Sequence, residues 1–346
     1  MKTLLDFLRE NRDVTLEEKG WGELDILLVA VLAYAPVRGF TEERGFGEFV
    51  EEILRYKPQK TDDLMTPKVK EVAKILEGAK RYEEMKIENF DDVFNDATQF
   101  GAICCRVIEA GQSVKTIGFR GTNNSVIGWI ENCRVVYQYP TITHILAIEY
   151  TKLHIKRGDK RVYLAGHSKG GNLAMVAGME AGFLRRRRIR QIYNFDGPGL
   201  RREQFYSRRF QRIRRKLKNV IPEQSVVGTL FLNKTKKVVK SNEKGVFAHY
   251  PTSWLLNKEL NGFIEGEQSR LSRQLHTNTV RGLATIDREQ TEIAFETIFR
   301  ALETQTRKKA TIGPENLLAI VKSIAGMDKK TRKYLMNVLG CLIKFK

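Results

Sequence analysis

Residues 161–174 read RVYLAGHSKGGNLA and combine a β-rich run, a glycine-flanked serine and a helix-forming run. The segment 161–165 has the composition of a short buried strand, and 172–177 is rich in good helix formers. The glycines on either side of the serine permit a sharp turn, because glycine has no Cβ to clash. A strand, a tight turn and a helix in this order expose the Ser168 hydroxyl at a sheet edge, where it can act as a nucleophile.

Two other interpretations of this segment are possible on its composition. A chance Gly-Ser turn is one, since both residues are common between strands and helices. A phosphate-binding loop is the other, but it requires glycine, lysine and then serine or threonine, whereas this chain has Ser168-Lys169-Gly170. The flanking strand and helix, together with Gly171, favour a nucleophilic serine.

Length and composition predict a folded protein with a substantial core, since 42% of the 346 residues are hydrophobic. The N-terminal segment has no apolar run long enough for a secretion signal or a membrane span, so we expect a cytoplasmic protein. No metal or cofactor is expected. The cysteines lack the spacing of metal ligands and are predicted to be reduced thiols: Cys104, Cys105, Cys133 and Cys341.

The formal net charge is +19, from 60 basic and 41 acidic residues. Much of the excess lies between Arg185 and Lys218, where the basic residues are opposed only by Asp196 and Glu203. Such a stripe attracts an anionic membrane surface or, less favoured here, nucleic acid. The alternative is a solvated helix face that keeps the protein soluble.

The pattern along the chain predicts an α/β fold with a mainly parallel central sheet covered by helices. The residues before about position 85 have helical periodicity, and 102–108 and 113–119 are β-rich runs joined as a hairpin. Further strands are expected at 192–195, 225–231 and 237–240, and a helix at 142–153.

We therefore expect a helical N-terminal portion (1–84), a core (85–304) with a basic lid-like insertion at about 183–220, and a helical C-terminal extension (305–346). Asp328 is predicted to cap a final helix over 329–345. The apolar face of that helix packs on its own domain or, alternatively, lies on a membrane.

A nucleophilic serine requires a base, and the chain order serine, acid, histidine leaves His249 and His276. His276 lies in a polar segment of helical character. His249 follows a strand in a loop before Pro251, where catalytic bases are commonly carried. We predict that His249 is the base, with a surface loop histidine as the alternative.

The acid is predicted at Asp196, which ends the strand after the nucleophile's helix and should emerge at the same sheet edge as Ser168. The alternative is that Asp196 accepts backbone amides in the turn that follows. Glu223 and Glu243 are weaker candidates.

The oxyanion of an acyl-transfer reaction is expected to accept hydrogen bonds from the backbone amide of Lys169 and from Thr122. Thr122 ends the segment FRGT at 119–122, which occupies the place of an early strand-to-helix loop. An ordinary helix entry before Trp129 is the alternative for this threonine.

With these residues in place, the chain resembles the class 3 lipases and, more closely, an uncharacterised bacterial family related to them. The resemblance covers roughly residues 1–300. It is carried by GFRGT at 118–122 with Gly128-Trp129, by the elbow at 166–174, by YNFDGPG at 193–199, by Ile221-Pro222 with SVVG at 225–228, and by Val239-Lys240-Ser241 before His249 and Trp254.

The resemblance implies an α/β-hydrolase fold with Ser168 as nucleophile, His249 as base and Thr122 at the oxyanion position. Class 3 lipases carry their acid in an Asp-x-Val-Pro stretch, whereas the matching place here, 225–228, has no carboxylate. Asn123 and Asn132 also stand where the bacterial family usually has acids. The triad is therefore completed by Asp196 or is degenerate.

The sequence thus predicts a serine hydrolase, resembling lipases and esterases, that cleaves a carboxylic ester through a Ser168 acyl-enzyme. The alternative is a weakly active or inactive scaffold that binds anionic lipid or nucleic acid through its basic stripe, with a peripheral position at a membrane. The substrate and the oligomeric state do not follow from the sequence.

Overall fold

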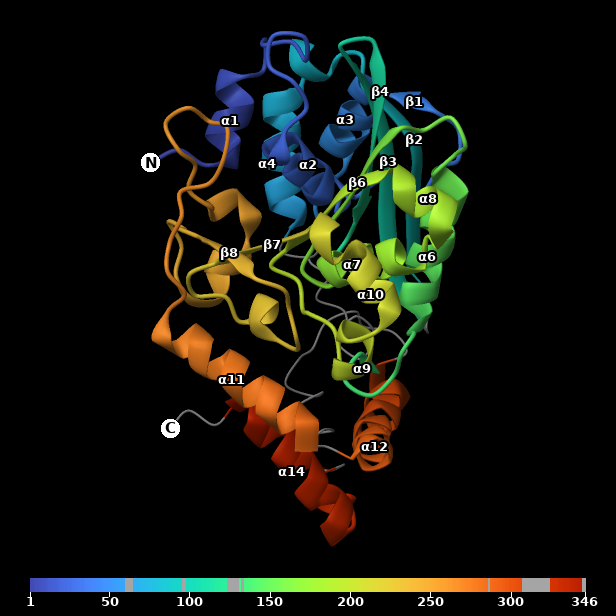
Figure 1. The fold of residues 1–346 in the computed structure, drawn as a ribbon, viewed down its shortest axis with the longest axis vertical. Helices are drawn as coiled ribbons and strands as arrows, with labels where there is room; N and C mark the ends of the chain where they lie inside the picture. Colours follow the sequence, from blue (N-terminus) through green and yellow to red (C-terminus); the bar gives the residue numbers. More distant parts are fainter. Residues whose placement is uncertain are drawn as a thin grey trace.

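The computed structural model describes residues 1–59, 65–94, 98–122, 131, 134–285, 287–306 and 324–343. These residues contain an eight-stranded sheet in the order β1 to β8 (Figure 1). Strands β1 to β4 pair antiparallel, and β4 to β8 pair parallel. The strands are β1 (Arg44–Gly45), β2 (Lys86–Phe94), β3 (Gln99–Glu109), β4 (Gln112–Phe119), β5 (Arg161–His167), β6 (Ile189–Phe195), β7 (Leu217–Pro222) and β8 (Lys236–Val239). An α/β fold with a mostly parallel sheet was predicted, and the structure has it.

The hairpin of β3 and β4 confirms the prediction made from the β-rich runs. Its two turn residues, Ala110 and Gly111, both have positive φ, at 47° and 70°. A two-residue turn with positive φ at both positions matches the right-handed twist of the strands, which fixes their register with Glu109 opposite Gln112.

Helices cover both faces of the sheet. One face packs against α1 (Leu4–Glu10), α2 (Glu23–Leu32), α3 (Phe46–Arg55) and α4 (Thr66–Leu76). The other packs against α6 (Ile142–His154), α7 (Lys169–Glu180) and α10 (Arg208–Ile213). Side chains alternate along β3, so Ile103 and Cys105 enter the first core and Ala102 and Cys104 the second.

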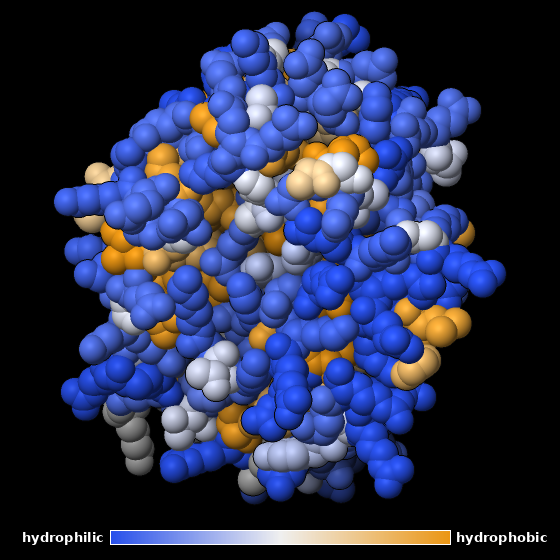
Figure 2. Space-filling view, turned by 45° about the horizontal axis from the view of Figure 1, so that its top comes forward, coloured by the Kyte–Doolittle hydropathy of each residue, from blue (hydrophilic) through white to orange (hydrophobic). Residues whose placement is uncertain are grey.

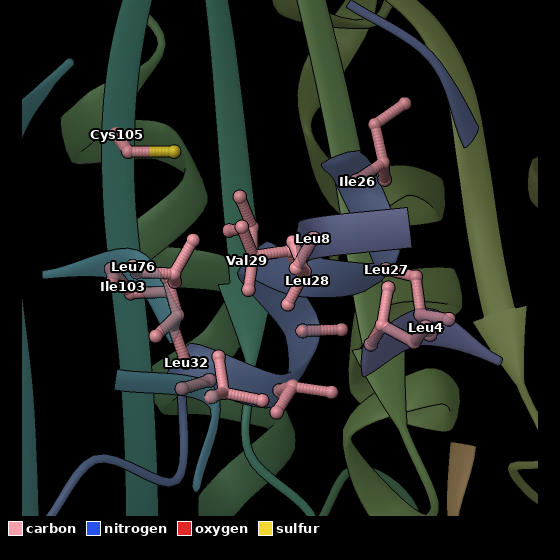
Figure 3. Close-up of a cluster of buried hydrophobic side chains, with 14 of the residues drawn as sticks. Leu4, Leu8, Ile26, Leu27, Leu28, Val29, Leu32, Leu76, Ile103 and Cys105 are labelled. Carbon is pink, nitrogen blue, oxygen red and sulfur yellow. The ribbon is translucent and has the colours of Figure 1, made fainter. Parts of the chain in front are cut away.

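Helix α2 is buried around its whole circumference, as expected for a helix that is apolar on every side (Figure 3). Its buried carboxylate, Asp25, is bound by Arg81 Nη2 at 2.9 Å and by the Tyr82 hydroxyl at 2.8 Å. Burial raises the pKa of Tyr82, so its hydroxyl stays protonated and donates a hydrogen bond to Asp25. The N-terminal helices therefore share a core with the sheet.

The C-terminal helices α11 (Arg270–Thr285), α12 (Arg288–Thr306) and α14 (Lys329–Ile343) lie together at one end of the molecule (Figure 1). The predicted cap of the last helix is confirmed, because Asp328 Oδ1 accepts hydrogen bonds from the amides of Lys330 and Thr331 at 2.9 and 3.0 Å. No helix in the described ranges is long and apolar enough to cross a membrane. The domain boundaries stay a prediction.

The remaining elements are short. Helix α8 (Gly182–Arg188) follows α7, and α9 (Arg202–Phe205) follows β6. Turns of 3₁₀ type occur at η1 (Lys80–Tyr82), η2 (Arg214–Lys216), η3 (Val227–Thr229), η4 (Gly245–His249) and η5 (Pro251–Ser253).

The strand predicted at 225–231 is wrong. The chain forms β7 earlier, over Leu217–Pro222, and then turns through η3. Val226 and Val227 have β-favouring side chains, but the turn is fixed by polar contacts of its ends, where the amide of Gly228 and the hydroxyl of Ser225 both bind Asp196. A tertiary contact therefore overrides local propensity in this segment.

Candidate active site

Ser168 stands between β5 and α7 with φ 57° and ψ −133°. A non-glycine residue with positive φ is strained and is held there by its surroundings. Two backbone hydrogen bonds do so, from Ser168 N to Phe195 O at 3.0 Å and from Gly171 N to Ser168 O at 2.9 Å. The turn is therefore tied both to β6 and to the first turn of α7.

The glycines of this turn are required by close packing. A Cβ on Gly166 would lie 2.1 Å from Gly170 O, and a Cβ on Gly170 would lie 2.0 Å from Phe119 O. Both distances are far below van der Waals contact, so neither position accepts a side chain. The turn thus packs directly on the end of β4, which leads to Thr122.

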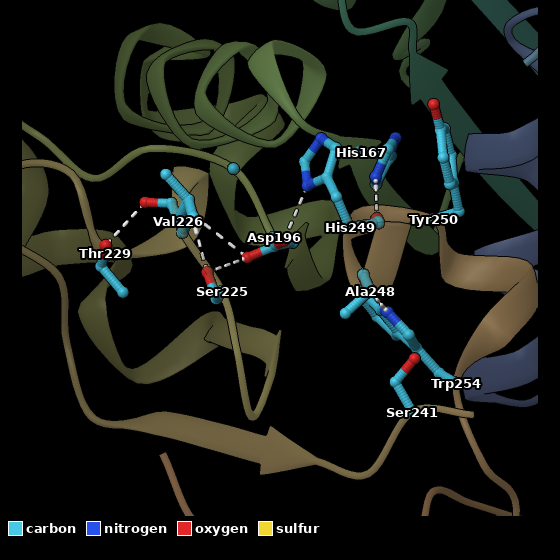
Figure 4. Close-up of polar contacts among 12 residues, drawn as sticks. His167, Asp196, Ser225, Val226, Thr229, Ser241, Ala248, His249, Tyr250 and Trp254 are labelled. Carbon is cyan, nitrogen blue, oxygen red and sulfur yellow. Dashed lines mark hydrogen bonds and ion pairs between the residues drawn. The ribbon is translucent and has the colours of Figure 1, made fainter. Parts of the chain in front are cut away.

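Asp196 and His249 are joined by a hydrogen bond of 2.7 Å between Asp196 Oδ2 and His249 Nδ1 (Figure 4). Asp196 is fully buried at the end of β6, and His249 ends η4 with its side chain 22% exposed. A carboxylate oxygen accepts, so His249 Nδ1 carries the hydrogen. In the neutral imidazole, Nε2 is then the atom that can accept a proton.

The second carboxylate oxygen of Asp196 is also occupied. Oδ1 accepts from the Ser225 hydroxyl at 2.5 Å and from the Gly228 amide at 3.1 Å (Figure 4). A fully buried carboxylate needs such donors, because burying a charge without them is costly. The stretch 225–228, where the sequence lacks an acid, therefore supplies hydrogen-bond donors to an acid on the neighbouring strand.

The alternative role of Asp196, as acceptor for the turn that follows it, does not match these contacts. The amide of Gly197 is bound instead by Asn194 Oδ1 at 2.9 Å. Asp196 itself has φ 49°, and its amide donates to Val220 O at 2.8 Å, which ties it to β7. Its carboxylate is thereby turned toward η3 and η4.

The structure does not bring the other candidates to this point. Glu223 Oε1 accepts from the amide of Glu267 at 3.4 Å, beside Gly266. Glu243 is exposed next to Ser241. His276 Nδ1 contacts the backbone oxygen of Thr229 at 2.7 Å, and burial lowers the pKa of this histidine. None of these contacts is with Ser168, Asp196 or His249.

His167 was not predicted to have a role, yet it connects the turn to the histidine loop. Its Nε2 contacts His249 O at 2.8 Å, and its Nδ1 contacts the Tyr34 hydroxyl at 2.9 Å. The rings of His167 and His249 lie 4.5 Å apart between centroids. The residue next to Ser168 therefore sets the position of the loop that carries His249.

The predicted oxyanion residues lie at the same place. A Cβ on Gly121 would lie only 2.8 Å from Ser168 Cβ, so the residue preceding Thr122 touches the serine. Lys169 is the first residue of α7, where backbone amides lack partners within the helix. The roles of Thr122 and Lys169 stay predictions, and residues 123–130, with Asn123, lie outside the described residues, as does Asn132.

The Lys169 side chain forms a buried ion pair that the sequence did not predict. Its Nζ lies 2.8 Å from Glu131 Oε2, and each side chain is 4% exposed. Glu131 also accepts from the Thr98 hydroxyl at 2.6 Å and the Gln99 amide at 3.2 Å. Burial lowers the pKa of Lys169, and Glu131 opposes that shift. The start of α7 is thereby anchored to β3.

The first part of the basic stripe lies away from this site. Arg185 to Arg188 belong to α8, which follows the far end of α7 and leads into the start of β6. Helix α7 has 12 residues and is therefore about 18 Å long. Ser168 and α8 thus lie at opposite edges of the sheet, and the segment 183–220, expected to resemble a lid, contains β6 and β7. Within the described part of the chain, no group of histidine, cysteine or acidic side chains is arranged to hold a metal ion.

Comparison with known proteins places the chain in a family. No curated protein has a significantly similar sequence. Among solved structures, the crystal structure of M37 lipase matches 94% of this chain and 98% of its own, with 12% identity and a TM-score of 0.36. The model of the Mbeg1-like family matches residues 76–300, a range that includes Ser168, Asp196 and His249. The chain therefore belongs to the Mbeg1-like family, which is lipase-like.

Proposed function

We propose that this protein is a serine hydrolase of the α/β-hydrolase type that cleaves a carboxylic ester, with a lipid-like ester as the preferred class. The observation that carries the proposal is the 2.7 Å contact between His249 Nδ1 and Asp196 Oδ2, next to a strained serine turn. Strained backbone at a polar residue is typical of functional sites, and an oriented imidazole is what a serine nucleophile requires. The Mbeg1-like family and its lipase-like character support the same class of reaction.

In the proposed mechanism, His249 Nε2 takes the Ser168 proton while Ser168 Oγ attacks the ester carbonyl. Asp196 stabilises the imidazolium that forms and keeps the ring in the required tautomer. The amide of Lys169 and Thr122 donate to the tetrahedral oxyanion. The imidazolium then protonates the leaving alcohol, and water, activated by His249, releases the carboxylic acid from the acyl-enzyme.

The contacts of Asp196 favour an active enzyme over an inactive scaffold. Ser225, Gly228 and His249 together hold both carboxylate oxygens, although 225–228 lacks the acid of the class 3 lipases. A buried carboxylate is costly unless it is hydrogen-bonded, and one of its three partners here is the His249 ring, which the contact orients. A cytoplasmic location remains part of this proposal.

A fluorophosphonate probe tests the proposal directly, because it modifies only an activated serine. Wild type should gain one adduct on Ser168, located by peptide mass spectrometry, and Ser168→Ala and His249→Gln should not be labelled. Ser113→Ala is the matched control, since Ser113 is exposed at the start of β4 and should leave labelling unchanged. Absence of an adduct in folded wild-type protein would overturn the proposal.

Turnover is measured with nitrophenyl esters of increasing acyl length. A rise of kcat/KM with chain length supports a lipid-like substrate, and a preference for the shortest ester restricts the enzyme to small esters. Release of nitrophenol by Ser168→Ala at the wild-type rate would contradict the acyl-enzyme mechanism.

A further inference from the structure

The edge of the sheet opposite Ser168 exposes large hydrophobic side chains. Helix α8 has no buried residue, and its Phe183 and Leu184 are 63% and 66% exposed. Leu153, at the end of α6, is 61% exposed. The two helices are joined there by a hydrogen bond from Arg185 Nε to Lys152 O of 2.8 Å, and α6 and α8 lie side by side (Figure 1). These three hydrophobic residues form the apolar part of what we call the α6–α8 edge.

The same edge carries positive charge that its own acids do not neutralise. None of Arg185 to Arg188 forms an ion pair with a residue in the described ranges. Arg188 instead donates to the backbone oxygens of Arg157 and Leu184, and the Arg187 guanidinium lies 5.7 Å from the Phe183 ring. These contacts orient the side chains but leave their charges uncompensated.

Neighbouring residues add to this charge. Lys216 is a further cation beside α8, since its Nζ donates to Arg186 O at 2.7 Å. Burial lowers the pKa of Lys216, and the charges of Arg186 and Arg190 lower it further. Nearby acids already have basic partners: Glu149 pairs with Lys152, and Glu180 pairs with Arg209. Exposed basic residues continue the edge along the chain: Lys156, Arg157, Lys160, Arg187 and Arg190.

The combination of exposed leucine and phenylalanine with arginine decides between a solvated face and a docking surface. A purely solvated basic helix has no need of adjacent exposed hydrophobic residues. Exposed apolar patches on a largely hydrophilic surface, as Figure 2 shows for one face of the molecule, often mark interaction sites. Nucleic-acid binding would use aromatic rings for stacking, whereas two of these three side chains are leucines. At a bilayer, the apolar side chains enter the headgroup boundary while the arginines bind lipid phosphates.

We propose that the α6–α8 edge docks on an anionic lipid bilayer, with Leu153, Phe183 and Leu184 entering the headgroup region and Arg185 to Arg188 binding phosphate. Because α7 separates this edge from Ser168 by its whole length, docking holds the candidate active site away from the bound membrane. The surface therefore determines where the protein resides, and it does not deliver the docked lipid to Ser168. This inference is independent of the proposed hydrolase activity.

Co-flotation with lipid vesicles tests it on the full chain. Wild type should bind vesicles of equal parts phosphatidylcholine and phosphatidylglycerol but not phosphatidylcholine alone, and binding should fall as salt shortens the screening length to about 10 Å at 0.1 M. Changing Arg185, Arg186, Arg187 and Arg188 to glutamine should weaken binding more than about tenfold. Phe183→Ser with Leu184→Ser should weaken it about tenfold while keeping every charge.

A matched control removes four positive charges elsewhere. Lys329, Lys330, Arg332 and Lys333 are exposed on α14, and their change to glutamine should leave vesicle binding within about twofold of wild type. All the substituted side chains are at least partly exposed, so every variant should be folded, which circular dichroism checks. Equal loss in the α14 variant, retention of binding in the α8 variants, or tighter binding to RNA than to vesicles at the same salt would overturn the proposal. Fluorophosphonate labelling of Ser168 should be the same with and without vesicles.

Discussion

His167 Nε2 lies 2.8 Å from the backbone oxygen of His249, which joins the residue before Ser168 to the residue that we propose as base. A carbonyl oxygen only accepts, so Nε2 carries the hydrogen and Nδ1 accepts from the Tyr34 hydroxyl at 2.9 Å. Burial lowers the pKa of His167 well below its usual value, and His249 lowers it further, so the ring stays neutral. The position of the His249 loop is thus set by a buried chain of two hydrogen bonds.

Tyr34→Phe removes the donor at the end of this chain and leaves the ring in place. His167 Nδ1 would be buried without a partner, so the free energy of unfolding should fall by about 1–3 kcal/mol. The rate of fluorophosphonate labelling at Ser168 should fall about fivefold, the equivalent of about 1 kcal/mol. Urea denaturation and labelling time courses measure both. Tyr206→Phe is the control, since Tyr206 is 62% exposed. Equal behaviour of the two variants would contradict the role given to Tyr34.

Asp196→Asn keeps the shape of the buried acid but presents an amide to His249 Nδ1. The imidazole is then free to take the wrong tautomer, and turnover of a nitrophenyl ester should fall by about 10⁴-fold. Circular dichroism checks that the variant is folded. Glu223→Gln serves as control, because Glu223 contacts the Glu267 amide and should leave turnover near wild type. If the losses were reversed between the two variants, Glu223 would be the acid.

Gly170→Ala should disrupt the serine turn, because the new Cβ would lie 2.0 Å from Phe119 O. Overpacking of this kind should cost about 3 kcal/mol in unfolding free energy and abolish labelling of Ser168. Gly158→Ala is the matched control, since a Cβ at Gly158 meets nothing within 4 Å. Thermal unfolding compares the two, and a Gly170→Ala protein as stable and reactive as Gly158→Ala would refute the packing argument.

His144 makes stability depend on pH. The ring is 1% exposed, with Nε2 2.7 Å from Asn172 Oδ1, and burial lowers its pKa from 6.5 to about 4. The unfolded chain therefore takes up a proton below 6.5 and the folded chain only near 4, so stability is lost as the pH falls through this window. The loss should reach about 3 kcal/mol. His144→Gln should make the dependence of unfolding free energy on pH less steep by this amount, with His154 and His167 carrying the rest. Ile145→Gln, on the same helix and 48% exposed, should keep the wild-type dependence.

Features encoded by neighbouring residues were predictable from the sequence, and those that depend on distant partners were not. The hairpin and the serine turn follow from local glycines and β-rich runs. Strand β2 was missed because it contains acidic residues. Glu88 is accommodated by Arg106 on β3 at 2.8 Å and by Lys115 on β4 at 2.9 Å. Local propensity cannot register such pairs.

The same contrast between local and distant partners holds for the candidate site. Chain order and strand ends brought Ser168, Asp196 and His249 into one hypothesis, and the structure joins the last two by a hydrogen bond. Tyr34 and Ser225 were missed, because their partners lie 133 and 29 residues away in sequence. A hydroxyl whose partner is distant in the sequence gives no sign that it orients a catalytic group.

Positive φ angles occur at both Ser168 and Asp196, at 57° and 49°. Each costs on the order of 1–3 kcal/mol, so the molecule is less stable than its packing alone would make it. Selection for heat resistance alone would therefore favour glycine at these two positions and discard both side chains. A variant that is both heat-resistant and reactive must gain stability elsewhere, as Gly158→Ala should by restricting the unfolded chain. In this protein, the trade-off between stability and catalytic activity thus lies in the backbone conformations of Ser168 and Asp196.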